Sequence, residues 1–581
     1  MPRLDRSALW PALWLGLMGG GLEVGIVAWR RFVEGKLVFV VSDYWWLAPV
    51  VTALLIAITA LLLVSITPLR FARLRARIRY AVPIFLASLG IVLLFSAVSD
   101  VAAIILALGL GIQGSVWLAS RAAGFERLIR WTLPLLALLP LLGGVAMRLT
   151  PGIRSSRSAV ADLPESAPNI LLIVLDTVRA IELGLYGLMP STSPNLDGFA
   201  QEGVVFEQAF STAPWTAPSH ASLFTGRNAG ELSIDWERPL DRRFPTLAEV
   251  LRDAGYATVG ITANRYYTSL ETGLARGFDH YEDSHLNLKR ALLLPRLPRE
   301  AVSAWRKLTN APEAVDLSRV RAERINRRFL RWAAGRQERP FFAFLNYFDA
   351  HAPYRAPEPH WSRFVSDQSP GGPRAGMVQS SSQARMQRRA YQAAIAHLDA
   401  QLGRLLNDLL VGGVLENTLV IITADHGEEF LEHGVIGHGH SLYTQSVRVP
   451  LIMVWPGHLP AGVRVRDPVS LDRIPSTILD LIGRSGPFTA PSLAGTWRGQ
   501  PLSPVAIRAT VSLARNSNSP FGAGGPIASV QIGSNRYIYR IRDATGQLYD
   551  HRNDPLETRN LAGEAGVGPL VMQLRDSLGM H

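Results

Sequence analysis

Three segments of the chain place acidic or imidazole side chains directly after a long apolar run. The segments are NILLIVLD (169–176), FFAFLNYFDAHAPY (341–354) and TLVIITADHGEEF (418–430). Unbroken apolar runs of this kind predict parallel strands that are buried on both faces, and ligands of such sheets bind beyond the carboxyl ends of the strands. We therefore expect four side chains to meet in one crevice: Asp176, His351, Asp425 and His426.

Asp176, Asp425 and His426 have the ligand types that a divalent cation takes. Carboxylate oxygens and an imidazole nitrogen suit Mg²⁺, Mn²⁺, Ca²⁺ or Zn²⁺. Taken singly, each residue has a structural alternative, because an Asp after a strand is often a turn or cap residue. The three together, with Asp and His adjacent and followed by Gly427, favour a metal site.

The segment APWTAPSHASLFTG (213–226) predicts the start of a helix beside a hydroxyl group. Pro218 suits the first turn of a helix, and Gly226 suits its C-terminal cap. Free backbone N–H groups at such a start bind phosphate or sulfate. Thr216 would lie beside them as a nucleophile, provided that a metal or base lowers its pKa. The alternative is that Thr216 or Ser219 only caps the helix.

Helical segments alternate with the apolar strands. TLAEVLRDAGY (246–256) and YQAAIAHLDAQLGRLLNDLL (391–410) have helical patterning, and in the second one face carries Ile395, Leu398, Leu402 and Leu405. Strands alternating with helices predict an open α/β sheet. We expect a catalytic domain over 169–490 and a C-terminal subdomain over 491–581.

The first 150 residues predict a membrane domain. Five stretches approach the roughly 20 apolar residues that cross a bilayer, near 8–29, 44–66, 81–99, 101–120 and 131–149. A cleaved signal peptide does not explain the first, because four more follow. The structural alternative for any one of them is a buried core helix. The polar stretch 151–168 is interpreted as a linker.

Arginine placement predicts the orientation of these spans. TPLRFARLRARIRY carries five arginines and SRAAGFERLIR carries three, which puts both loops in the cytoplasm. A multi-pass protein of the cell (inner) membrane would then have everything after residue 150 outside the cytoplasm. The loop near 30–43, with three basic residues, is a mild objection.

Composition narrows the classes of partner and of chemistry. Lys and Arg number 59 against 47 acidic residues, and cysteine is absent. Without cysteine there is no disulfide, zinc–thiolate site or cysteine nucleophile. The basic excess is diffuse and gives no reason to expect nucleic acid. It fits anionic substrates or membrane lipids better.

Several motifs in this order resemble the sulfatase family of the alkaline phosphatase superfamily. They are NILLIVLDTVR, APWTAPSHASLFTG, NYFDAHAPY, TADHGEEF and HGHSLYTQSVRVPLI, with the closing GQLYDHRNDPLETRNLA. The resemblance covers roughly 169–563 and implies a mixed α/β sheet sandwiched by helices. It implies a metal on Asp176, Asp425 and His426, attack by Thr216, and His351 on the non-bridging ester oxygens. His438 or His440 would lie near the same group, with His440 preferred from its spacing to RVPLI.

The chain departs from that pattern at chemically important positions. Sulfatases carry a cysteine or serine at Thr216 and convert it to formylglycine, which a threonine, lacking an unsubstituted methylene, does not form. Sulfatases have an arginine two residues past the proline, where this chain has His220. The lysines of the sulfatase substrate pocket have no counterpart in this chain. Relatives often show Asp-His where this chain has Ile181 and Glu182, so the metal site has one carboxylate fewer unless Glu182 reaches it.

The resulting expectation is a metal-dependent hydrolase of sulfate or phosphate esters with a threonine nucleophile. Its substrate would be an anionic ester of a glycan, a lipid head group or a small molecule. Thr216 would attack while Ser219 and histidines bind the transferred group, namely His220, His351, His438 and His440. Histidine partners predict a rate that falls above about pH 7. Two alternatives stay open: a phosphoglycerol or phosphoethanolamine transferase acting on envelope lipids or glycans, and a non-catalytic envelope protein.

Overall fold

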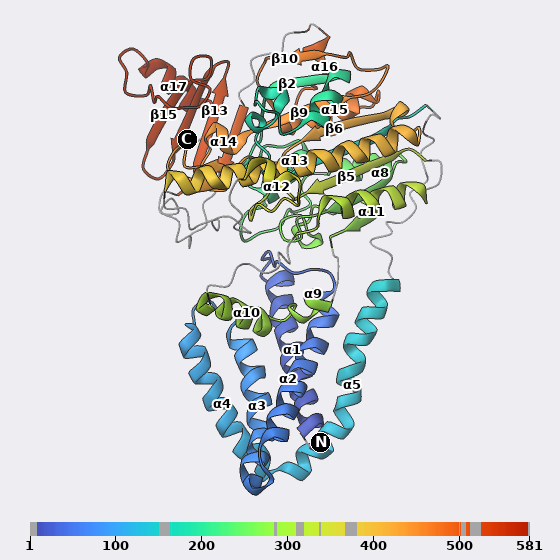
Figure 1. The fold of residues 1–581 in the computed structure, drawn as a ribbon, viewed down its shortest axis with the longest axis vertical. Helices are drawn as coiled ribbons and strands as arrows, with labels where there is room; N and C mark the ends of the chain where they lie inside the picture. The colour runs from blue at the N-terminus through green and yellow to red at the C-terminus, as the bar shows by residue number, and fades with distance from the viewer. Residues whose placement is uncertain are drawn as a thin grey trace. The chain divides into compact units, whose positions relative to one another are not determined.

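The computed structural model describes residues 8–149, 163, 166–283, 288–309, 319–335, 339–365, 380–498, 500, 507–511 and 525–578 (Figure 1). The chain forms two compact units. One consists of Met1–Gly152 with Ser284–Leu317, and the other of Ile153–Asp283 with Ser318–His581. Most of the predicted linker 151–168 lies outside the described residues.

The first unit contains long apolar helices. They are α1 (Leu9–Phe32), α2 (Tyr44–Ile66), α3 (Ala72–Val92), α4 (Asp100–Ser120) and α5 (Ala122–Leu149). Four helical segments are long and apolar enough to cross a membrane: Leu9–Phe32, Tyr44–Ile66, Asp100–Ser120 and Ala122–Ala146. The expectation of five spans is therefore corrected to four candidates among the described residues.

The predicted third span, 81–99, differs from the helix that forms. Helix α3 begins at Ala72, within the arginine-rich segment, and ends at Val92. Because arginine is a good helix former, α3 includes the basic residues of this segment. Their charges make α3 too polar to count as a candidate membrane span. Helix α4 begins at Asp100, because the Ser99 hydroxyl accepts a hydrogen bond from the Ala102 N–H and caps it.

The second unit is built on a mixed nine-stranded sheet, as the sequence predicts. Its order is β10-β2-β9-β6-β1-β5-β3-β4, with β11 beside β2. Strand β1 pairs in parallel with β5 and β6, whereas β9 runs antiparallel to β2 and β6. The strands are β1 (Asn169–Leu175), β2 (Val204–Phe210), β3 (Ala257–Thr262), β4 (His280–Glu282), β5 (Phe341–Tyr347), β6 (Thr418–Thr423), β9 (Arg448–Val454), β10 (Val463–Val465) and β11 (Val469–Ser470).

Helices pack in two groups around this sheet. Helix α11 (Ala322–Ala334) contacts β3 and β5 and packs against α13 (Ser381–Val411), which also contacts α6 (Pro194–Phe199) and α12 (His360–Phe364). Helix α7 (Thr216–Thr225) packs against α8 (Leu247–Asp253) and α15 (Ile474–Leu481). Shorter helices are α14 (Thr444–Val447) and α16 (Ala494–Trp497).

The predicted helices form where their local signals lie. Thr246 and Glu249 form a capping box at the start of α8. The predicted apolar face of α13 is buried at Ile395, Leu398, Leu402 and Leu405. Helix α7 ends at Gly226 in the left-handed conformation, as expected, with φ 61°.

A smaller sheet lies toward the C-terminus, within the range predicted as a subdomain. It is antiparallel, in the order β12-β13-β14-β15. Its elements are β12 (Ile507–Val511), β13 (Ile527–Ile532), β14 (Asn535–Arg540) and β15 (Thr545–Asp550), with α17 (Gly568–Asp576) against β13 and β14. A two-stranded hairpin joins β7 (Glu429–Phe430) to β8 (Ile436–Gly437).

Candidate active site

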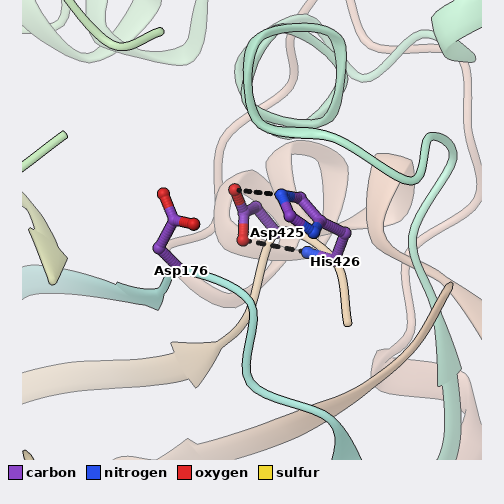
Figure 2. A group of neighbouring side chains, drawn as sticks. All are labelled: Asp176, Asp425 and His426. Carbon is purple, nitrogen blue, oxygen red and sulfur yellow. Dashed lines mark hydrogen bonds and ion pairs between the residues drawn. The ribbon is translucent and has the colours of Figure 1, made fainter. Parts of the chain in front are cut away.

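Parallel strand register brings the predicted acidic residues to one edge of the sheet. Leu175, the last residue of β1, pairs with Tyr347 of β5, and Val174 pairs with Thr423 of β6. Asp176 therefore lies beside Asp425 and His426, although these residues are far apart in sequence (Figure 2). One ligand atom from each of the three lies within 4.8 Å of the others, and all three side chains are buried.

The free atoms of this group fit a divalent cation. Asp425 Oδ1 accepts hydrogen bonds from the backbone N–H groups of Thr177 (3.2 Å) and His426 (2.9 Å), while its buried Oδ2 has no hydrogen-bond partner. Asp176 Oδ1 is likewise buried without a partner. His426 Nδ1 donates to the Gly427 carbonyl at 2.9 Å, which leaves Nε2 as the coordinating atom. Buried polar atoms without partners are rare, and a cation would satisfy all three.

The electrostatics of the group also favour a bound cation. Burial raises the pKa of the Asp176 carboxyl, and the neighbouring Asp425 carboxylate raises it further. Burial likewise raises the pKa of Asp425. Burial lowers the pKa of His426, which keeps its imidazole neutral, the form that binds metal. Two buried carboxylates facing each other require a positive charge between them to stay ionised.

Thr216 lies over this group at the start of α7. Its Oγ1 is 3.4 Å from His426 Nε2 and 3.4 Å from Asn264 Nδ2. The N-cap residue of α7 is Trp215, whose side chain makes no capping hydrogen bond. Ser219 donates instead to the Asp425 carbonyl at 2.6 Å. Neither Thr216 nor Ser219 caps the helix, so the structural alternative to a reactive hydroxyl does not apply.

Ser219 and His220 both contact backbone carbonyl groups of the site. The Ser219 hydroxyl fixes the loop that carries Asp425. His220 Nδ1 lies 2.8 Å from the Thr216 carbonyl and its ring packs edge-on against Phe344. Burial lowers the pKa of His220 to about 4. The expected role of His220, neutralising charge on the transferred group, stays a prediction.

Two other histidines lie beside the metal group. The His438 ring is 4.4 Å from the His426 ring and 5.0 Å from the His351 ring, measured between centroids. His438 Nδ1 pairs with Glu428 Oε1 at 2.8 Å. Burial alone would lower the pKa of His438, but the Glu428 carboxylate raises it above its ordinary value. Burial, and then the charge on His438, lower the pKa of His351 to about 4.

The preference for His440 over His438 stays a prediction, and the contacts of these two residues differ. Strand pairing sets Glu429 opposite Gly437, so Glu428 and His438 lie next to each other across the β7–β8 hairpin. No ring contact of the described residues joins His440 to His426 or His351. Burial and then the charge on His438 lower the pKa of His440.

Two site residues were missed in the sequence, and one expected candidate is engaged elsewhere. Asn264, which follows β3, donates to Asp176 Oδ2 at 2.9 Å. The sequence feature that could have identified Asn264 is the one that identified Asp176 and Asp425: a polar residue just after an apolar strand. Glu428 follows the Asp-His-Gly motif directly. Glu182, the expected extra ligand, binds Arg179 and Arg388 at 2.7 Å each and Gln392 at 2.8 Å.

The mixed α/β sheet holds two carboxylates and an imidazole at its strand ends, next to a helix start that carries a threonine hydroxyl. This arrangement is that of a hydrolase of the alkaline phosphatase superfamily. The chain belongs to the sulfatase family, because the model described as Sulfatase matches residues 168–484.

Individual relatives agree with this assignment. The chain is similar to an uncharacterized sulfatase, YidJ, of Escherichia coli (strain K12), at 27% identity over 450 residues that cover 71% of this chain and 86% of the relative. Human arylsulfatase A is 28% identical over 460 residues, covering 70% and 86%. A phosphonate monoester hydrolase of Agrobacterium radiobacter has the same fold, with a TM-score of 0.56 at 22% identity over 71% of this chain and 94% of that one.

Proposed function

We propose that this protein is a membrane-anchored, extracytoplasmic hydrolase of sulfate or phosphate esters with Thr216 as its nucleophile. The observation that carries the proposal is the position of the Thr216 hydroxyl, 3.4 Å from His426 Nε2 and over the buried acidic group. The names of its relatives include both an arylsulfatase and a phosphonate monoester hydrolase, which supports an anionic ester of sulfur or phosphorus as substrate.

Asp176, Asp425 and His426 would hold the divalent cation, which can be Ca²⁺, Mn²⁺, Mg²⁺ or Zn²⁺. The bound cation would supply Lewis acidity that lowers the pKa of the Thr216 hydroxyl. Asn264 donates to Asp176 and lies at hydrogen-bonding distance from Thr216, and so orients both. Ser219 keeps the start of α7 against the Asp425 loop, and His220 contacts the Thr216 carbonyl within the helix.

The Thr216 oxygen would form a bond to sulfur or phosphorus as the bond to the ester oxygen breaks, and the leaving oxygen would take up a proton. Water would then cleave the threonine ester and release sulfate or phosphate. His438, kept protonated by Glu428, is the charged group that would face the transferred oxyanion. His351 donates its Nδ1–H to the Ala352 carbonyl at 2.7 Å and packs beside the His438 ring. Such preorganised donors contribute a few kcal/mol each in a site that excludes water. We propose no formylglycine, since a threonine side chain does not convert to this aldehyde.

We infer the membrane location and orientation from the apolar helices and the placement of their arginines. The four apolar helical segments support an anchor in the cell (inner) membrane. Arg121, Arg127 and Arg130 stand at the start of α5, and the positive-inside rule assigns that end to the cytoplasm. Helix α5 would then carry the chain across, which leaves the sulfatase domain outside.

A second candidate function is transfer of a phosphoglycerol or phosphoethanolamine group to envelope lipids or glycans. The observation that favours it is the presence of apolar helices in the same chain as a threonine nucleophile. A transferase would use water poorly as an acceptor, so product release in the absence of a lipid or glycan acceptor distinguishes the two.

The test compares the purified full-length protein with its Thr216→Ala variant. Each is given an aryl sulfate, a phosphomonoester and a phosphodiester, with Mn²⁺, Mg²⁺, Ca²⁺ or Zn²⁺ in turn. Turnover that depends on Thr216 supports the proposal and identifies the element attacked. Turnover that persists at full rate in Thr216→Ala contradicts it.

A further inference from the structure

An insertion in the sulfatase domain belongs structurally to the helical unit. Between β4 and β5 the chain forms α9 (Leu288–Leu292) and α10 (Arg296–Thr309). These helices cluster with Met1–Gly152 rather than with the sheet. Helix α9 contacts α2, and α10 contacts α3 (Figure 1). The sequence alone had left this segment without an interpretation.

A buried carboxylate of α1 fixes the start of α10. Glu23 is only 2% exposed, and its Oε1 accepts hydrogen bonds from the backbone N–H of Arg296 at 2.8 Å and from the Tyr44 hydroxyl at 3.1 Å. Arg296 is the first residue of α10, so a carboxylate from an apolar helix satisfies a free N–H group of another helix and complements its dipole. The next residue, Leu297, packs against Leu89 of α3.

The face of α10 that bears Leu297 is an apolar stripe. At 100° per residue, Leu297 shares this face with Ala301, Ala304, Trp305 and Leu308. The opposite edge carries Arg296, Arg299, Ser303 and Arg306. Trp305 is 65% exposed and Leu308 is 83% exposed. Only the first residue of the stripe, Leu297, packs against α3 and α4, and the rest of the stripe is exposed.

We propose that α10 is an interfacial helix that binds the phospholipid surface around the membrane helices. Its apolar stripe inserts among acyl chains, and the arginine edge on the other side stays out of them. The occupant is lipid because the stripe continues an apolar surface: α4, beside α3, exposes Val101 by 67% and Ile105 by 66%. The inference rests on the proposed membrane location of these helices.

The chain contains no cysteine, so single cysteines can carry a nitroxide label in the full-length protein. The variants are Leu308→Cys on the stripe, Ser303→Cys on the opposite edge and Leu139→Cys as a reference on α5. Each is reconstituted in vesicles of phosphatidylethanolamine and phosphatidylglycerol. Power saturation then measures access to oxygen, which enters lipid, and to a water-soluble nickel chelate.

The labels at Leu308→Cys and Leu139→Cys should be accessible to oxygen and protected from nickel, and the label at Ser303→Cys should show the reverse. If nickel reaches Leu308→Cys and Ser303→Cys equally while Leu139→Cys is protected, α10 is not an interfacial helix. The proposed membrane location of the other helices would still stand. Access to nickel at Leu139→Cys would overturn the membrane location as well. None of these readings depends on turnover, so a failed ester assay leaves the result intact.

A second measurement tests the Glu23 contact. Adding Glu23→Ala to Leu308→Cys should raise nickel access at the label, because the α10 start loses its acceptor. The matched control is Glu34→Ala, an exposed carboxylate paired with Lys36. Unchanged protection with Glu23→Ala, in protein that remains monodisperse, would contradict the proposed anchoring of α10.

Discussion

The hydroxyl oxygen of Thr216 and Nε2 of His426 lie 3.4 Å apart, although 210 residues separate them in the chain. His426 donates its other ring nitrogen to the Gly427 carbonyl. The nitrogen that faces Thr216 therefore carries a lone pair, as a metal ligand requires. This pairing joins the helix start to the metal group and makes the following outcomes testable.

Thr216→Ala should abolish turnover and leave metal binding intact. The variant loses the attacking oxygen, which we expect to lower kcat/KM on the order of 10³-fold or more. Thr216→Ser keeps the oxygen and should retain part of the activity. Steady-state kinetics with the best ester substrate measures the loss, and calorimetric metal titration gives the affinity. Equal loss in the Ser and Ala variants would argue against a nucleophilic role.

Metal affinity should fall as the pH falls. Burial raises the pKa of Asp176 and of Asp425, so protons compete with the cation for both carboxylates. Binding should release protons, and more of them at mildly acidic than at alkaline pH. Titration calorimetry in two buffers of different ionisation enthalpy counts those protons.

Asp425→Asn provides the matching variant for that experiment. It keeps the shape of the side chain and removes the charge, which should weaken metal binding by about 10²-fold or more. The exposed Asp408→Asn serves as control and should bind metal as the parent protein does. A parent-like affinity in Asp425→Asn would exclude Asp425 as a ligand.

Glu428→Gln should move the alkaline limb of the pH–rate profile to lower pH. The Glu428 carboxylate raises the pKa of His438, so protonated His438 persists to higher pH and is lost as the pH rises through that value. Removing the carboxylate lowers the pKa of His438, because the charge that stabilises the imidazolium is lost. The profile of kcat/KM measures the shift.

Tyr354→Phe is the control for that shift. It removes the Tyr354 hydrogen bond to Glu428, which is 2.9 Å long, but keeps the carboxylate. Its alkaline limb should stay close to that of the parent. A profile in which Glu428→Gln leaves the limb unmoved would show that His438 does not control the rate.

Glu182→Gln should destabilise the protein without weakening metal binding. Glu182 is buried and pairs with Arg179, which is itself only 1% exposed in its side chain. Removing one partner of a buried ion pair costs roughly 3 kcal/mol, which lowers the melting temperature. The exposed Glu202→Gln should leave it unchanged. A marked loss of metal affinity in Glu182→Gln would instead support the sequence-based idea that Glu182 reaches the cation.

Asn264→Ala should lower kcat and weaken metal binding about 10-fold, the usual effect of losing a residue that orients a ligand. The variant removes the donor to Asp176 Oδ2 and the amide that lies 3.4 Å from the Thr216 hydroxyl. Calorimetry and kinetics on the same preparation separate the two effects. Parent-like values of both would show that Asn264 has no positioning role.

The sequence by itself determined the sheet and the residues at its strand ends. Apolar runs ending in Asp176 and in Asp425–His426 specify parallel central strands, and parallel strands bring their carboxyl ends to one edge. The Thr216 hydroxyl followed from the helix signals of Pro218 and Gly226. These predictions hold because strand burial and helix termination are local properties of the chain.

Only the tertiary structure decided which neighbours act on that group. The β7–β8 pairing sets Glu428 beside His438, so His438 is the histidine that we propose for the transferred group. The packing of α7 commits Ser219 and His220 to backbone carbonyls. Contacts of this kind depend on how separate elements meet, which no local pattern encodes.

The same reason explains the membrane region. The apolar runs predicted membrane spans. They did not predict that α3 begins at Ala72 or that α10 belongs to the helical unit, because both depend on contacts between side chains of separate elements. Glu23 is an unexceptional acid in the sequence of α1. It becomes an anchor only because the fold brings the Arg296 N–H to its carboxylate.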